Sequence, residues 1–383
     1  MEYKLFSADS HVSEPADLWT ERIDKAFRFR APRVESLERD GRMQEFFLYE
    51  GFPPHPVGIG LGAAVAQEGR ADLRAGTNTT SYSNARPGGW DPVVRLGDQD
   101  VDGVEGEVLH TTLAFRLFWL RDAKLQEACF RVYNDWLAEY CSHSPNRLIG
   151  VPLISLYNVE AAVTELRRTA ALGLKGAMVW LSPPEGAPPF SSPHYDPFWA
   201  EAQDLEMPVV LHEITGAGES RLSQAYWDEH RVLQNVIAPH EAQRTFAQLI
   251  LSGVCERFPS LRLISAENGT DWLPLWLKRL DGAIKRVRGE NTYPTALTLQ
   301  PTEYFHRQVY FSYINEPEAV EHRHEIGVDN LMWASDYPHS ASTWPKSLEV
   351  VDRDTSAIPA EERRKLVHDN VLRVYGVAAP VTA

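Results

Sequence analysis

The feature that most constrains this fold is a regular alternation between short apolar runs and longer stretches with apolar residues at helical spacing. Most of the runs are continuously apolar, which is typical of strands buried on both faces of a parallel sheet. We predict eight such strands, at residues 3–9, 106–113, 148–155, 175–182, 208–214, 261–268, 308–314 and 331–337.

The stretches between the runs predict helices. One of them begins at Asn158, a favourable N-cap residue, and ends at Gly173, a favourable residue just after a helix. Eight strand–helix units favour an α/β fold, a (β/α)8 TIM barrel, over an open doubly wound sheet. No G-x-G-x-x-G motif follows the first strand, which weakens a dinucleotide-binding alternative. The helices are expected at residues 122–142, 158–173, 240–258, 271–287 and 360–376.

A long insertion after the first strand interrupts this rhythm at residues 28–95. Its middle is rich in Gly, Ala, Asn and Ser, and long irregular loops are commonly functional or disordered. On a barrel, a loop that follows a strand lies at the catalytic face. We therefore expect one domain over residues 1–383, with 28–95 as a lid or an oligomer arm within it.

Composition excludes several classes of protein. A net charge of -15 argues against a broad nucleic-acid surface, which needs clustered Lys and Arg. The three cysteines, Cys129, Cys141 and Cys255, form no CxxC pair, so neither a disulfide framework nor a thiolate zinc site is expected. No apolar run is long enough for a membrane span, and the first residues lack a signal pattern. We expect a cytoplasmic protein that binds a small molecule.

Polar residues stand at the ends of several predicted strands. Asp9 and His11 close the first strand two positions apart, so their side chains point the same way. His212 ends the fifth strand, and Asp336 ends the eighth. Buried charges need a partner, and one divalent cation at the barrel mouth would satisfy all four. Imidazole and carboxylate ligands suit Zn, Mn or Fe, and Zn is the first expectation.

Each of these residues has another interpretation when taken alone. A D-x-H tripeptide arises by chance, His212 is equally well a satisfied core histidine, and Asp336 before Tyr-Pro fits a turn. The metal prediction therefore rests on their joint position at the strand ends.

Several segments carry a resemblance to a known family, and they span nearly the whole chain. Two motifs in these segments are specific when they occur together. SDYPH lies at the eighth strand, and G-x-x-x-R-F-P-x-L-R lies before the sixth. The chain resembles the amidohydrolase superfamily, in the amidohydrolase-2 branch that contains aminocarboxymuconate semialdehyde decarboxylase and resorcylate-type decarboxylases. The matching segments are residues 8–19, 95–109, 210–213, 252–281, 331–345 and 369–376.

The resemblance implies the same four ligands, with Asp336 either binding the metal or relaying a proton, and it implies a homo-oligomer such as a dimer. The sixth strand departs from the family pattern, because Glu267 stands where the decarboxylases usually place a histidine. The Lys and Arg that hold the muconate substrate have no match. His240, which opens the helix after the fifth strand, is a candidate second acid/base together with Glu267.

Three hypotheses of function follow. The first is a metal-dependent hydrolase or non-oxidative decarboxylase of a small organic acid or amide, with Asp336 as proton shuttle and an apolar mouth lined by Trp180, Trp272 and Tyr337. The second is an oxygen-dependent monooxygenase with two Fe, or Fe and Mn, for which Glu267, His240 and His339 would supply further ligands. The third is a non-catalytic partner subunit.

Overall fold

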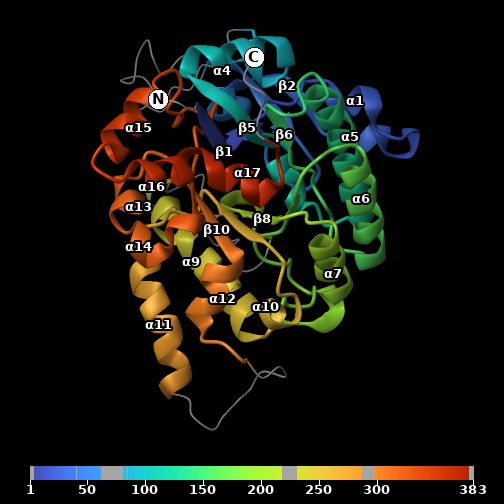
Figure 1. Cartoon of the computed structure of the whole chain (residues 1–383). Helices are drawn as coiled ribbons and strands as arrows, with labels where there is room; N and C mark the ends of the chain where they lie inside the picture. Colours follow the sequence, from blue (N-terminus) through green and yellow to red (C-terminus); the bar gives the residue numbers. More distant parts are fainter. Residues whose placement is uncertain are drawn as a thin grey trace.

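The computed structural model describes residues 4–39, 41–61, 81–83, 85–217, 231–286 and 297–378 (Figure 1). Eight parallel strands lie at the predicted places in the sequence, which confirms the strand prediction. They are β1 (Leu5–His11), β5 (Val104–His110), β6 (Leu148–Gly150), β7 (Ala177–Val179), β8 (Val209–His212), β9 (Leu263–Ala266), β10 (Val309–Tyr313) and β11 (Leu331–Trp333).

The strands form two parallel sheets, in the orders β1-β5-β6 and β11-β10-β9-β8-β7. A single bridge between Leu153 and Met178 links the sheets at one seam. At the other seam the Asp336 amide donates to the Asp9 carbonyl at 3.0 Å, and the His11 amide donates to the Tyr337 carbonyl at 2.7 Å. Within the described residues the ladders do not form one closed sheet, because β6, β7 and β11, which flank the seams, have only three residues each.

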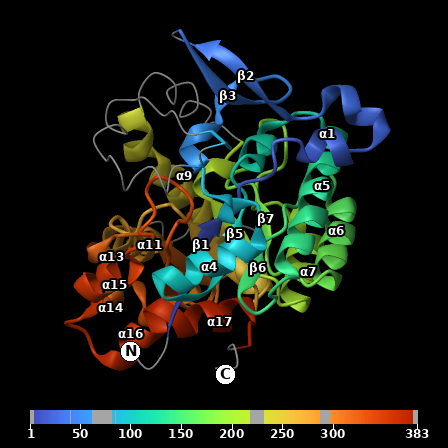
Figure 2. The ribbon, with the colours of Figure 1, turned by 90° about the horizontal axis from the view of Figure 1, so that it is seen from above.

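Helices follow the strands along the chain and pack around the sheets (Figures 1 and 2). Asp122 accepts hydrogen bonds from the Lys124 and Leu125 amides at the start of α5, and Asn158 caps α6 as predicted. The predicted helix at 240–258 begins earlier, at Arg231, and is broken before Val254 by left-handed Gly253. The described α-helices are α1 (Leu18–Arg22), α4 (Pro92–Asp102), α5 (Ala123–Cys141), α6 (Val159–Ala171), α7 (Asp196–Asp204), α9 (Arg231–Leu251), α10 (Val254–Arg257), α11 (Leu273–Arg286), α12 (Pro301–Gln308), α13 (Pro317–Glu321), α14 (Arg323–Ile326), α15 (Ser347–Thr355), α16 (Ala360–Arg364) and α17 (Asn370–Tyr375).

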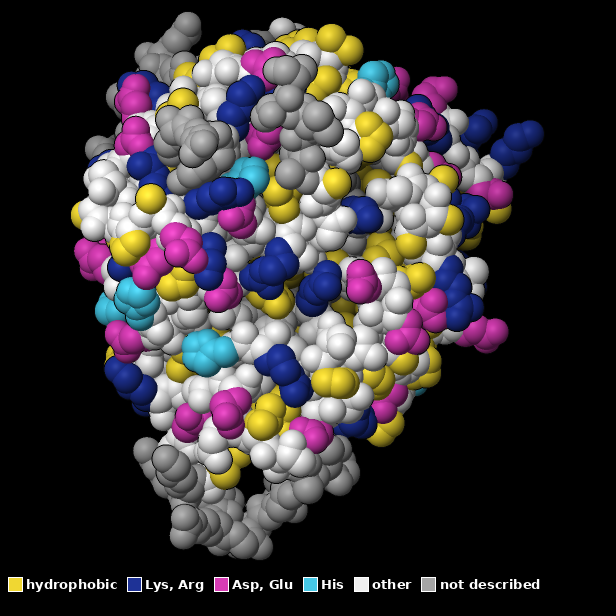
Figure 3. Space-filling model, viewed as in Figure 1, with side chains coloured by type: hydrophobic (Ala, Val, Ile, Leu, Met, Phe, Trp, Pro, Cys, Tyr) yellow, Lys and Arg dark blue, Asp and Glu magenta, His cyan; other side chains and the backbone are white. Residues whose placement is uncertain are grey.

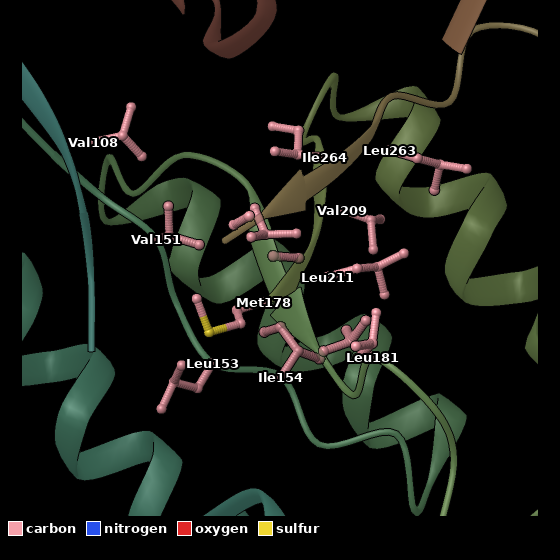
Figure 4. Close-up of a cluster of buried hydrophobic side chains, with 14 of the residues drawn as sticks. Val108, Val151, Leu153, Ile154, Met178, Leu181, Val209, Leu211, Leu263 and Ile264 are labelled. Atoms are coloured by element: carbon pink, nitrogen blue, oxygen red, sulfur yellow. The ribbon is translucent and has the colours of Figure 1, made fainter. Parts of the chain in front are cut away.

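The core contains apolar side chains from neighbouring strands and the segments that follow them. Figure 4 shows Val108, Met178, Val209 and Ile264 among these side chains, and all four are completely buried. Removing such side chains from water is the main favourable term in folding. The continuously apolar runs of the sequence are therefore explained by burial.

The insertion contains regular structure that the sequence analysis did not predict. β2 (Arg33–Arg39), β3 (Arg42–Leu48) and β4 (His55–Pro56) form an antiparallel sheet. In Figure 2 β2 and β3 lie at the end of the molecule opposite both termini. Residues 62–80, the middle of the insertion, lie outside the described residues, so a role as lid or oligomer arm stays a prediction. The same part of the chain contains three short 3-10 helices: η1 (Lys25–Arg30), η2 (Val57–Leu61) and η3 (Pro87–Gly89).

The surface seen in Figure 3 carries acidic and basic side chains that are interspersed. The net charge of -15 is therefore not gathered into one acidic patch on this face. None of the described helices combines the length and apolarity that crossing a bilayer would require.

One buried ion pair connects the strands that carry polar residues at their ends. Arg95 of α4 is fully buried, and its Nε donates to Glu107 Oε2 at 2.6 Å. Its Nη1 donates to the His11 carbonyl at 2.7 Å, and its Nη2 donates to the Tyr337 carbonyl at 3.3 Å. Arg95 therefore fixes β1 and the segment after β11 relative to β5.

We predict that Arg95→Met lowers the free energy of unfolding by about 3–5 kcal/mol, because it leaves Glu107 as a buried charge without its partner. Urea denaturation followed by circular dichroism measures this loss. Arg167→Ala is the matched control, since Arg167 pairs with Glu201 at the surface, where water and salt screen the pair, and its loss should change the stability little. Equal effects of the two substitutions would contradict the assigned role of Arg95.

Candidate metal centre

The structure brings the acidic and imidazole side chains of four strand ends together. The Nε2 atom of His11 lies 3.1 Å from Glu267 Oε1, 3.2 Å from Asp336 Oδ1 and 3.5 Å from Asp9 Oδ1. His212 Nε2 lies 3.7 Å from Glu267 Oε2 and 4.0 Å from Asp9 Oδ1. The predicted convergence of Asp9, His11, His212 and Asp336 is therefore present in space, with Glu267 among them.

The backbone at two of these residues is strained. Glu267 and Asp336 each have φ of 56°, in the left-handed region that non-glycine residues rarely adopt. Such conformations cost of order 1–3 kcal/mol and tend to occur at functional sites. At Asp336 the hydrogen bond from its amide to the Asp9 carbonyl holds the backbone in this conformation.

His11 presents one defined nitrogen to the cluster. Its Nδ1 lies 2.8 Å from the Thr111 carbonyl, which only accepts, so Nδ1 carries a hydrogen and Nε2 faces the carboxylates. Burial alone would lower the pKa of His11, but hydrogen bonds to Asp336 and Glu267 raise this pKa well above its usual value. The surrounding carboxylates thus favour a positive charge at this point.

His212 is buried without a hydrogen-bond partner for either ring nitrogen among the described residues. Burial lowers the pKa of His212 well below its usual value, so the ring is neutral and carries a free lone pair. A neutral imidazole with an available nitrogen is the form that binds transition metals. The unpartnered nitrogen is thus explained if His212 is a metal ligand.

The three carboxyl groups differ in their protonation. Burial raises the pKa of Asp9, but the His110 ring opposes it and the result is a pKa of about 2. Burial also raises the pKa of Asp336, yet contacts with His339 and His11 bring it below its usual value. For Glu267, burial and the charge of Asp336 act together and raise the pKa well above its usual value. Glu267 is therefore the carboxyl group that most needs a cation in order to ionise.

His110 is a site residue that the sequence analysis did not single out. Its Nδ1 lies 2.7 Å from Asp9 Oδ1, and the Ser312 hydroxyl donates to Asp9 Oδ2 at 3.0 Å. His110 ends β5, the second of the eight parallel strands, so the same strand-end position that identified Asp9 and His212 applied to it as well. The pair of contacts fixes the orientation of the Asp9 carboxylate.

The side chains fall into two overlapping groups whose ligand atoms all lie within 4.8 Å of one another. One contains Asp9, His11, His212 and Glu267, and the other contains His11, Glu267, Asp336 and His339. Ligand atoms on adjacent corners of an octahedron with 2.1 Å bonds lie about 3.0 Å apart, and those on opposite corners about 4.2 Å. The measured separations of 3.0 to 4.0 Å fit this range, so the residues fit a divalent cation.

His240 is not brought into this cluster. It lies exposed on α9, and neither group of candidate ligands includes it. We expected His240 near the site because it follows the fifth strand. However, the position of a residue along the chain does not determine which face of the helix carries it.

The three aromatic residues predicted to line the mouth make packing contacts. The buried Trp180 indole donates to the Phe118 carbonyl at 3.1 Å, and the Tyr337 hydroxyl donates to Asp98 at 2.5 Å. Trp272 is half-buried and donates to the Asn268 carbonyl at 2.9 Å. Phe115 lies nearer to the cluster, with its ring centre 4.3 Å from that of His212. Phe115 therefore brings an apolar ring against the cluster, a contact that the sequence analysis did not predict.

Comparison with protein families matches residues 99–377 to the amidohydrolase family. A gamma-resorcylate decarboxylase from Rhizobium radiobacter is 26% identical over 285 residues, covering 71% of this chain and 85% of that protein. A 2-amino-3-carboxymuconate-6-semialdehyde decarboxylase from Dictyostelium discoideum is 27% identical over 257 residues, covering 65% of this chain and 67% of that protein. These are the two kinds of decarboxylase that the sequence resembles, which confirms the resemblance.

Solved structures share the fold. An amidohydrolase from Mycobacterium avium subsp. paratuberculosis K-10 superposes with a TM-score of 0.78 at 23% identity, covering 98% of this chain and 100% of that one. A dihydroxybenzoic acid decarboxylase from Polaromonas sp. JS666, with bound manganese and the inhibitor 2-nitroresorcinol, has a TM-score of 0.67 at 19% identity, covering 98% and 97%.

We predict that His110→Ala weakens the binding of a divalent cation about 10- to 100-fold, because a residue that orients a ligating carboxylate contributes on that scale. Isothermal titration of the metal-free protein with Mn²⁺ as the probe measures this change. His110→Asn retains a donor toward Asp9 and should recover part of the affinity. An unchanged affinity in His110→Ala would show that the contact with Asp9 has no part in cation binding.

Proposed function

This chain belongs to the amidohydrolase family, and on that premise we propose that it is a metal-dependent enzyme that removes carbon dioxide from a small, cyclic or aromatic carboxylic acid without an oxidant. The observation that carries the proposal is the buried cluster in which Asp9, His11, His212, Glu267 and Asp336 converge. The decarboxylases among its relatives support the type of reaction.

We propose a divalent cation held by these side chains, with Mn²⁺ or Zn²⁺ as the candidates. Manganese in the Polaromonas decarboxylase supports Mn²⁺, and the nitrogen and oxygen donors suit either ion. When bound, the cation supplies a positive charge that polarises a substrate oxygen and stabilises the negative charge that develops during the reaction.

The rest of the reaction needs a proton at a defined place. When the bond to the carboxylate breaks, carbon dioxide leaves and the electron pair remains on the substrate carbon, which must then take up a proton. Asp336 Oδ1 lies 3.0 Å from His339 Nδ1, and His339 Nε2 lies 3.0 Å from the Thr112 hydroxyl. We propose that the Asp336–His339 pair delivers this proton, with Asp336 as the group beside the substrate.

We propose that Phe115 forms an apolar wall of the substrate site, which favours a flat, hydrophobic substrate body. Phe115 lies against both His212 and His11, with ring centres 4.3 and 5.7 Å apart. An aromatic ring stacked there would place its carboxylate toward the cluster. A simple amide would gain less from this wall, so decarboxylation is favoured over amide hydrolysis.

We further propose that the two parallel sheets act as one closed barrel in a single domain, with the insertion placed over its catalytic end. The hydrogen bonds from Asp336 to Asp9 and from His11 to Tyr337 support closure at one seam, and the Leu153–Met178 bridge supports it at the other. The fold shared with the Mycobacterium amidohydrolase agrees with this arrangement.

A second candidate is an oxygen-dependent monooxygenase with Fe, or with Fe and Mn. It is favoured by the surplus of carboxylates, since Glu267 adds a third acidic group to Asp9 and Asp336. Consumption of oxygen by the Fe²⁺-loaded protein in the presence of an organic acid supports this candidate, and carbon dioxide release under anaerobic conditions supports the decarboxylase instead.

We predict that Mn²⁺-loaded protein, incubated anaerobically with 2,6-dihydroxybenzoate and related ring acids, releases carbon dioxide and leaves one deuterium on the product ring in D2O. Asp336→Asn should lower kcat about 10²- to 10⁴-fold, because the group that delivers the proton is lost. Asp100→Asn, on the exposed face of α4, is the control and should leave kcat unchanged. Full activity in Asp336→Asn would refute the proposed proton delivery.

A further inference from the structure

We propose that Glu14 is a positioning residue of the metal centre, which holds His11 in place for the cation through the peptide group that joins Thr111 to Thr112. Glu14 lies three residues after His11, within one of the segments that resemble the family, and no role has yet been assigned to it. Its role depends on the metal dependence in the proposed function, but not on the reaction that is catalysed.

The Glu14 carboxyl group is fully buried and accepts hydrogen bonds from the short segment that directly follows β5. Its Oε1 accepts from the Thr112 amide at 3.3 Å, from the Ala114 amide at 3.2 Å and from the Thr111 hydroxyl. Its Oε2 accepts from the Leu113 amide at 2.9 Å. Burial raises the pKa of Glu14, but these hydrogen bonds oppose the rise and favour a negative charge. The segment is therefore ordered around one buried carboxyl group.

A single peptide group connects this carboxyl group to a candidate ligand. The Thr112 amide and the Thr111 carbonyl belong to the same peptide group, and the carbonyl accepts from His11 Nδ1 at 2.8 Å. Hydrogen bonds in a chain polarise one another, so the charge of Glu14 makes the carbonyl a stronger acceptor. A stronger acceptor at Nδ1 fixes the imidazole ring and makes Nε2 a better donor to a cation. Glu14 therefore acts on His11 without touching it.

The same segment carries two further contacts of the site. The Thr112 hydroxyl lies 3.0 Å from His339 Nε2, and the Phe115 ring centre lies 4.3 Å from that of His212. Movement of the segment would therefore disturb both contacts together with the hydrogen bond to His11. One buried carboxyl group thus holds three parts of the site in register.

Asp102 offers a matched comparison at the other end of β5. It is also buried, and it fixes another segment by accepting from the Ser347 amide at 2.9 Å and from the Ser347 hydroxyl at 2.5 Å. Neither group of candidate ligands among the described residues includes Asp102 or Ser347. A carboxyl group that only stabilises the fold should therefore behave like Asp102.

The first test is the affinity for Mn²⁺ of the metal-free, full-length protein, measured by isothermal titration. Glu14→Gln keeps the shape of the side chain but removes its charge, and its amide group must turn hydrogen atoms toward at least one backbone N–H. We expect the affinity to fall about 10-fold, as when a group that orients a ligand is lost. The control Asp102→Asn should leave the affinity unchanged.

The second test is a nuclear magnetic resonance signal of the His11 ring. Zn²⁺ is diamagnetic, so the Nδ1–H proton of His11 can be observed in Zn²⁺-loaded protein labelled with ¹⁵N-histidine, and its absence in His11→Gln assigns it. We expect this resonance to move upfield in Glu14→Gln, because its acceptor carbonyl becomes weaker. It should not move in Asp102→Asn.

Circular dichroism establishes that each variant is folded. If Glu14→Gln does not fold, Glu14→Asp replaces it in both tests, because Asp keeps the charge but withdraws its oxygens from the Thr112 amide. Unchanged affinity or an unmoved resonance in a folded Glu14 variant, or an equal loss of affinity in Asp102→Asn, would overturn the proposed role. Failure of the wild-type protein to bind Mn²⁺ would refute the metal dependence as well, whereas binding without decarboxylation would refute only the proposed reaction.

Discussion

Three carboxyl groups share one buried point, and the site must offset the repulsion among them. Asp9, Glu267 and Asp336 all lie within 3.5 Å of His11 Nε2, where little water reaches them. Like charges at such distances are strongly unfavourable unless a positive charge lies between them. The left-handed backbones of Glu267 and Asp336 add a conformational cost at the same point.

The fold supplies this arrangement because parallel strands bring their carboxyl ends to one side. Arg95 connects β1, β5 and the segment after β11 at that side. The insertion contacts the same side of the fold. The Ser13 hydroxyl donates to the Gly60 carbonyl at 3.3 Å, and a Cβ at Gly60 would lie 2.1 Å from Thr112 Cγ2. Only glycine fits at this approach, so the insertion is matched to the residues beside His339.

The sequence was sufficient to predict the features that are set by the burial of side chains. Continuous apolar runs predicted all eight parallel strands, and ligand types at strand ends predicted that Asp9, His11, His212 and Asp336 would meet. The sequence was insufficient for features that depend on exposed residues or on the direction of a side chain. β2 was not predicted because it carries exposed polar residues, although the Asp40-Gly41 dipeptide before β3 is a hairpin signal. His240 faces solvent on its helix, and the role of His110 depends on a contact 101 residues away.

Anomalous diffraction from a crystal grown with Mn²⁺ tests directly whether the cluster of buried carboxylates and imidazoles binds a cation. We predict anomalous density between the ends of β1, β8, β9 and β11, with His212 Nε2, Asp9 and Glu267 at bonding distances of about 2.0–2.3 Å. Density bound elsewhere, or a cluster that contains only water at saturating Mn²⁺, would contradict it, because the buried carboxylates would then be balanced by protons alone.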